Sequence, residues 1–211
     1  LTIDSIHDSP KSMEPGLAIS EIDIATHFSR FKPTTTIPVP QSREWNYGGY
    51  HWRKRHLDLI EYSKTTKGDL VFIGDSITHR WGAPPFDETP TTGKAIWDQF
   101  YAHRQALNLG YGWDRVENMI WRIHDGELDH VDPRLVVVMA GTNNLEVNTP
   151  DEIAAGVRHL CSNIHQQCPK AKILLLAVFP RGQEGFSKEL IELNKLLAKL
   201  DSRPFITFKD I

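Results

Sequence analysis

Cysteine is scarce in this sequence, and neither of the two copies, Cys161 and Cys168, belongs to a pattern that carries chemistry. They stand in an expected helix, about 10 Å apart along its axis at 1.5 Å per residue. A disulfide needs Cα atoms within about 7 Å, so we expect two buried thiols that do not pair. No group of Cys and His has the spacing of metal ligands. The cysteines therefore indicate neither a compartment nor a metal.

Long hydrophobic runs and an excess of either charge are also missing. No apolar run approaches the ~20 residues that a membrane-spanning helix needs. The net charge is −3, with no basic stripe and no block of like charge. We therefore expect neither a membrane nor a nucleic acid as a partner. With 40% hydrophobic and 24% charged residues, the composition is that of an ordinary globular domain.

Residues 1–44 differ from the remainder, because they contain a run of three threonines (34–36) and many of the prolines. Residues 29–44 indicate either a linker or an arm strapped to the following domain. Residues 17–24 (LAISEIDI) alternate like an edge strand. They resemble a closing strand of a β-sandwich carbohydrate-binding module, although a plain N-terminal arm explains them as well. Residues 1–44 are thus expected to be an arm, or the remnant of an upstream module with its linker.

From residue 45 to 211, apolar runs alternate with helical patterns. Strands are expected at 69–74, 106–110, 134–141, 171–179 and 204–211, and helices at 49–66, 94–103, 115–125, from Thr149 to before Pro169, and at 185–200. Continuous apolar strands separated by helices predict a parallel sheet that is covered on both faces. In such sheets, ligands bind outside the carboxyl ends of the strands.

Two of these helices carry signals for their first residues. Asp114, with Glu117 three residues later, has the spacing of a capping box. Thr149 precedes a proline and two acids, which favours a cap, a proline in the first turn and a stabilised helix dipole. We therefore expect helices to begin directly after Asp114 and after Thr149.

Three expected strands end in a glycine followed by polar groups: 74–76 (GDS), 110–114 (GYGWD) and 141–144 (GTNN). Ester hydrolysis would explain the set, because it needs a hydroxyl nucleophile and donors for a developing oxyanion. Ser76 has the hydroxyl and an N–H at a helix start, 110–114 offers a second backbone N–H, and Asn143 a side-chain N–H. Taken singly, Ser76 or Asp75 is explained as a helix cap and Asn143 as a turn residue.

Together, the motifs GDSIT (74–78), ALNLGYGWD (106–114), WRIHDGEL (121–128) and AGTNN (140–144) resemble the SGNH (GDSL) hydrolase superfamily. The similarity is to the branch of platelet-activating-factor acetylhydrolase catalytic subunits and bacterial carbohydrate O-acetylesterases. It covers about residues 45–211. It implies a flavodoxin-like three-layer α/β/α sandwich, with a central parallel sheet of about five strands, and ester hydrolysis without metal or cofactor.

The same resemblance assigns the site residues. Ser76 would be the nucleophile and first oxyanion donor, and Asn143 the side-chain donor. The backbone donor would be Trp113, where the family usually has glycine. A backbone N–H does not require glycine, and the indole would crowd the pocket or offer a face to a sugar ring.

The family's general base comes from a D-x-x-H motif after the last strand, which residues 1–211 do not reach. His79 could share a helix face with Ser76, but nothing nearby in the sequence obviously orients it. We expect an additional C-terminal segment, or a second chain, to complete the site. A relative that binds without catalysis is the other interpretation.

The expected substrate is a small-molecule or carbohydrate ester carrying a short acyl group, above all acetyl. Trp81 and Trp113 flank the motifs and favour a substrate with a ring face, although core packing would also explain them. A short-chain lipid or generic carboxylic ester is the alternative. The resemblance alone favours a secreted or periplasmic protein.

Overall fold

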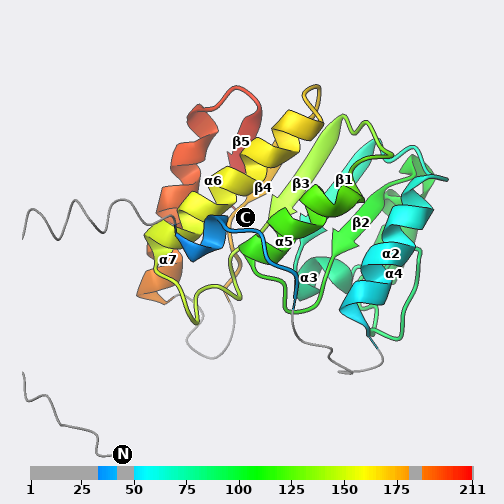
Figure 1. The fold of residues 1–211 in the computed structure, drawn as a ribbon, viewed down its shortest axis with the longest axis horizontal. Coiled ribbons are helices and arrows are strands. Elements are labelled where there is room, and N and C mark those ends of the chain that lie inside the picture. The colour runs from blue at the N-terminus through cyan, green and yellow to red at the C-terminus, as the bar shows by residue number, and fades with distance from the viewer. Residues whose placement is uncertain (1–32, 42–49, 181–186, 211) are drawn as a thin grey trace, which may run out of the picture. The chain divides into compact units, whose positions relative to one another are not determined.

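A parallel sheet forms the centre of the fold. Its strands are β1 (Leu70–Gly74), β2 (Leu107–Gly110), β3 (Leu135–Met139), β4 (Lys172–Leu176) and β5 (Ile206–Lys209). They pair in the order β2-β1-β3-β4-β5 (Figure 1). The computed structural model describes residues 33–41, 50–180 and 187–210. The predicted central parallel sheet of about five strands is therefore confirmed, and its strand order is that of flavodoxin-like folds.

Helices connect the strands, and those described, apart from the short α3, lie where the periodicity predicts them. They are α2 (Trp52–Ser63), α3 (Ser76–His79), α4 (Lys94–Phe100), α5 (Val116–Arg122), α6 (Pro150–Gln167) and α7 (Lys188–Ala198), with short 3-10 turns at Thr34–Thr36, Ala102–Arg104 and Lys199–Ser202 and a π-helical turn at Ile123–Glu127. No described helix has both the length and the apolarity to cross a membrane.

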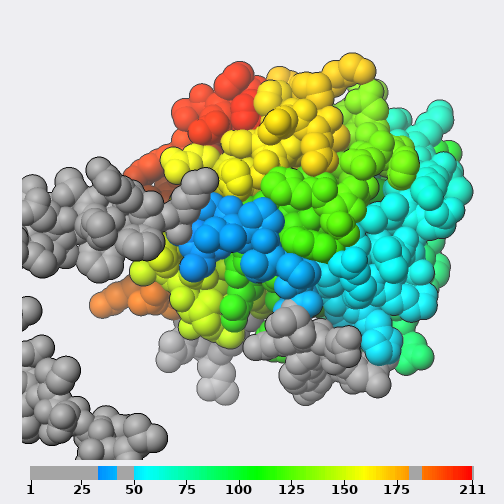
Figure 2. Space-filling model, viewed as in Figure 1, coloured from blue at the N-terminus to red at the C-terminus, as the bar shows by residue number. Residues whose placement is uncertain are grey.

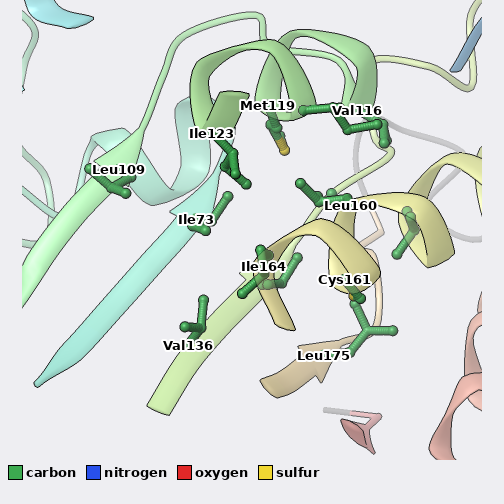
Figure 3. Close-up of a cluster of buried hydrophobic side chains, with 14 of the residues drawn as sticks. Ile73, Leu109, Val116, Met119, Ile123, Val136, Leu160, Cys161, Ile164 and Leu175 are labelled. Carbon is green, nitrogen blue, oxygen red and sulfur yellow. The ribbon is translucent and has the colours of Figure 1, made fainter. Parts of the chain in front are cut away.

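Side chains alternate in direction along each strand, so the apolar strands present apolar side chains on both faces of the sheet. Helices pack on both faces and cover them. On one face, Ile73 and Val136 belong to the main core together with buried residues of α5, α6 and α7. Figure 3 shows part of this core in close-up. On the other face, Phe72 packs against Trp97 of α4. The predicted arrangement of helix, sheet and helix layers is confirmed.

Two local predictions are also confirmed. The Thr149 hydroxyl accepts from the Glu152 N–H at 3.4 Å, the Glu152 carboxylate accepts from the Thr149 N–H at 2.9 Å, and Pro150 opens α6. Cys161 and Cys168 are both buried and unpaired with each other.

Residues 33–41, called the strap here, lie along α5 and α6, and Figure 2 shows them in blue on the surface. The Thr35 hydroxyl donates to the Glu152 carbonyl at 2.6 Å. The Val39 N–H donates to the Glu117 carbonyl at 3.3 Å, and the Val39 carbonyl accepts from Asn118 Nδ2 at 3.0 Å. This part of the predicted arm is therefore attached to the domain. The predicted edge strand at 17–24 lies outside the described residues.

Candidate active site

The carboxyl ends of three neighbouring strands bring the three glycine-led segments to one edge of the sheet. Gly74 of β1 pairs with Gly110 of β2 on one side and with Met139 of β3 on the other. The Tyr111 N–H also donates to the Gly74 carbonyl at 3.1 Å. A Cβ on Gly110 would lie 2.3 Å from the backbone nitrogen of His79, so only glycine permits this approach.

Ser76 is the first residue of α3 and is half-buried. Asp75 is the residue that caps this helix, since its Oδ1 accepts from the Ile77 N–H at 2.9 Å. The sequence allowed either Ser76 or Asp75 as the helix cap, and the structure shows that Asp75 is the cap. Ser76 stands in the first turn, where backbone N–H groups have no partner within the helix.

Trp113 has a left-handed backbone, with φ of 64°. This region favours glycine and costs other residues about 1–2 kcal/mol. The glycine usual in the related family is therefore explained by the backbone that this position adopts. The side chain is 44% exposed, which places the indole at the surface. The Trp113 carbonyl accepts from Gln41 Nε2 of the strap at 3.3 Å.

The two asparagines after β3 have different partners. Asn143 is buried, and its Nδ2 donates to the main-chain carbonyl of Asp114 at 2.9 Å. Asn144 accepts from the Val116 N–H at 3.0 Å and donates to the Glu117 carboxylate at 2.9 Å. Asn144 therefore holds the start of α5, whereas Asn143 joins the 141–144 segment to the 110–114 segment.

The capping box predicted for Asp114 and Glu117 is wrong. The cap of α5 is Arg115, whose N–H donates to Asn118 Oδ1 at 2.9 Å. The Asp114 carboxylate is buried and accepts from Trp52 Nε1 at 2.6 Å and from Arg122 Nε at 2.8 Å. Two buried donors, one of them charged, hold this carboxylate more strongly than a helix end would.

Asp114 belongs to a buried charge network with Arg122 and Glu127 that the motifs in the sequence do not indicate. The fully buried Arg122 guanidinium also contacts Glu127, whose other oxygen accepts from the Tyr111 hydroxyl. Burial raises the pKa of Asp114 to about 7, against the opposing effect of Arg122. Burial also opposes ionisation of Glu127, but the Arg122 charge holds its pKa below the ordinary value. The signal in the sequence was an arginine within the apolar run 119–123 (MIWRI).

His79 has a partner that the sequence did not reveal. Its Nε2 lies 2.9 Å from Asp87 Oδ2, and Arg55 Nη1 donates to the same oxygen at 3.3 Å. The imidazole is buried against the Tyr50 ring, and burial lowers its pKa despite the nearby Asp87. Within 33–41, 50–180 and 187–210, no group of three His, Cys, Asp or Glu side chains could hold a metal ion.

Comparison with known proteins gives relatives along most of the chain. Platelet-activating factor acetylhydrolase IB subunit alpha2 of Homo sapiens is 32% identical over 146 residues, which are 69% of this chain and 59% of that protein. The Gallus gallus subunit is 29% identical over 176 residues, or 82% of this chain and 72% of its own length. The chain spans about 59% of the length of the mammalian alpha2 relatives.

Solved structures share the fold at low identity. A GDSL-like lipase from Bacteroides thetaiotaomicron superposes with a TM-score of 0.56 at 17% identity, over 74% of this chain and 76% of that one. The acetyl xylan esterase AlAXEase gives 0.53 at 16% identity, over 67% and 76%. The model of the GDSL-like lipase/acylhydrolase family matches residues 72–211. The chain belongs to that family, as its four motifs predict.

Proposed function

We propose that this chain is the core of a serine ester hydrolase that removes short acyl groups, acetyl above all, from carbohydrate. Ser76 is the nucleophile. The N–H groups of Ser76 and Trp113 and the carboxamide of Asn143 are the oxyanion donors. The observation that carries the proposal is the hydrogen bond from Asn143 to the Asp114 carbonyl, which joins two of the three strand-end segments next to Trp113.

In this mechanism, Ser76 Oγ attacks the ester carbonyl carbon while a general base takes the hydroxyl proton. The carbonyl oxygen becomes an oxyanion, and each fixed donor is worth about 2.7–4 kcal/mol at that stage. The alcohol leaves with a proton returned by the base, and water then hydrolyses the acyl-serine. We propose that the base is a histidine of a segment beyond residues 1–211 or of a second chain.

Two features support the substrate. The curated relatives are named acetylhydrolases, which favours an acetyl group. The exposed indole of Trp113 stands beside the proposed donors, and an aromatic face with a polar edge suits the ring of a sugar.

The test uses the full-length protein and a short ester, 4-nitrophenyl acetate. Ser76→Ala should abolish hydrolysis above the uncatalysed rate, since no other hydroxyl is proposed to attack. Ser162→Ala, a serine on α6 that donates to the Arg158 carbonyl, is the matched control and should keep full activity. Retained turnover in Ser76→Ala would reject the nucleophile. An inactive wild type that still binds sugar would favour the non-catalytic interpretation.

Esters of longer acyl chains are the second candidate, because an apolar cavity of about 380 Å³ begins at Ile77, directly after Ser76. It continues over the sheet face past Phe72 and Val137. A series of 4-nitrophenyl esters from acetate to octanoate distinguishes the two candidates. We expect kcat/KM to fall with chain length, and a rise would favour a lipid substrate.

A further inference from the structure

A polar cavity of about 230 Å³ opens between the strap and the 110–114 segment. Val39 and Gln41 of the strap line one side of it, and Trp113 and Asn143 line another. We call this cavity the strap cleft. Two proposed oxyanion donors thus border a space whose other wall lies outside the family match at 72–211.

The lining of the strap cleft suits hydroxyl groups. Arg115, Glu117, Asn118 and Glu146 also line it, so one charged donor, two carboxylates and several carboxamides surround the space. The cavity beyond Ile77, in contrast, is bordered mainly by Phe, Trp, Leu and Val side chains. The strap cleft therefore suits polar ligand groups, whereas the cavity beyond Ile77 suits apolar ones.

Hydrogen bonds between the strap and the domain preform this cleft. Asn118 Nδ2 donates to the Val39 carbonyl at 3.0 Å, and Gln41 Nε2 donates to the Trp113 carbonyl at 3.3 Å. Because these hydrogen bonds already hold the strap in place, binding of a ligand costs little conformational entropy there, which favours affinity. The strap therefore forms a fixed wall of the cleft.

We propose that the strap cleft binds the alcohol portion of the ester, a single hydroxylated ring such as a pyranose, and that the strap determines this specificity. The inference rests on the proposed function, because it takes Trp113 and Asn143 as the groups at the reacting carbonyl. Pockets for drug-sized ligands measure about 300–1,000 Å³, so this cleft suits one small ring. The exposed Trp113 indole offers that ring an apolar face.

The test fills the cleft without removing a hydrogen bond. Val39→Trp adds bulk at a side chain that is 42% exposed, while the Val39 backbone keeps its two bonds. Ile37→Trp, on the same strap but outside the cleft lining, is the matched control. Arg115→Ala is the second variant, and it removes a polar group from the cleft in case Val39→Trp does not fold.

The two substrates are methyl 2-O-acetyl-β-D-xylopyranoside and methyl acetate, which share the acetyl group. The methyl alcohol of the second is too small to fill the strap cleft. Val39→Trp should raise KM for the sugar ester at least about tenfold and lower kcat/KM for methyl acetate much less. Arg115→Ala should act in the same direction, and Ile37→Trp should change neither value. Equal losses on both esters, or no loss on either, would overturn the proposal.

A binding measurement separates this inference from the proposed function. If the full-length protein hydrolyses neither ester, the proposed function fails, and binding of methyl β-D-xylopyranoside, followed by NMR, decides on the cleft. Binding that Val39→Trp weakens and Ile37→Trp preserves would support a sugar subsite without catalysis. Absence of binding by this inactive wild type would overturn the cleft as well.

Discussion

The carboxamide of Asn143 is oriented by the main chain of Asp114, because its Nδ2 donates to the Asp114 carbonyl at 2.9 Å. A carbonyl oxygen only accepts, so the amide nitrogen must face it. The Asp114 side chain is held in turn by Trp52 and Arg122. The position of the Asn143 carboxamide therefore depends on Asp114, a residue that buried hydrogen bonds hold in place, and not on groups at the surface.

Asn143→Ala should lower kcat of the full-length protein by about 10²-fold or more, because one oxyanion donor is lost. Asn144→Ala is the informative neighbour, since Asn144 bonds Val116 and Glu117 instead. It should reduce the free energy of unfolding more than Asn143→Ala does. Steady-state kinetics and urea unfolding of both variants check this, and a near-normal kcat for Asn143→Ala would remove it from the mechanism.

The left-handed backbone of Trp113 predicts an unusual order of stabilities. Trp113→Gly should be more stable than Trp113→Ala by about 1 kcal/mol, because only glycine adopts this conformation without strain. At an ordinary exposed position, alanine would be at least as stable as glycine. Chemical unfolding of the two variants measures the difference, and a more stable alanine variant would contradict the strained backbone.

Arg122→Met should cost about 3–5 kcal/mol of unfolding free energy, because it leaves two buried carboxylates, Asp114 and Glu127, without their cation. Lys170→Ala removes the exposed pair with Asp132 and should have no measurable effect. Equilibrium unfolding compares the two. Similar stabilities would show that the buried network contributes no more than a surface pair.

Acid should destabilise the protein through His79 and Asp87. Burial lowers the folded-state pKa of His79, so the unfolded chain binds more protons below about pH 6.5 and stability is lost as the pH falls. Although burial opposes it, the bond from His79 holds the pKa of Asp87 below its ordinary value, which adds a loss below about pH 4. Both effects have the same sign.

His79→Gln should therefore flatten the dependence of unfolding free energy on pH between about pH 7.5 and pH 5. The exposed His103→Gln is the control and should leave the slope of the wild type. Urea titrations at several pH values supply the slopes. An unchanged slope in His79→Gln would place the titrating group elsewhere.

The fold was predictable because its signals are local and repeated. Each strand is a short apolar run, and Thr149 with Pro150 marks the start of α6 by chemistry within a few residues. The three glycine-led segments could be assigned to one edge of the sheet because parallel strands share their carboxyl ends. That reasoning needs no knowledge of distant contacts.

The role of the Asp114 carboxylate, the partner of His79 and the attachment of the strap could not be predicted, because they depend on contacts that no local pattern marks. Asp114 has the local spacing of a helix cap, yet its carboxylate accepts a hydrogen bond from Trp52, 62 positions away. His79 gains its partner from a loop eight residues later, in which no pattern marks Asp87. The strap has no helical or strand periodicity in its sequence, and its attachment depends on Thr35 meeting α6 at Gly156. Local propensity cannot predict such pairings.

The attachment of the strap has a practical consequence for how a gene fragment is cut. A fragment that begins at residue 72, where the family match starts, would lose the Arg55 side chain, which donates to the Gly110 carbonyl at 3.0 Å and the Asn108 carbonyl at 3.2 Å. A fragment that begins at residue 45 would keep Arg55 but discard Val39 and Gln41. Expression boundaries for this chain should therefore be drawn upstream of Pro33, however well a shorter piece aligns.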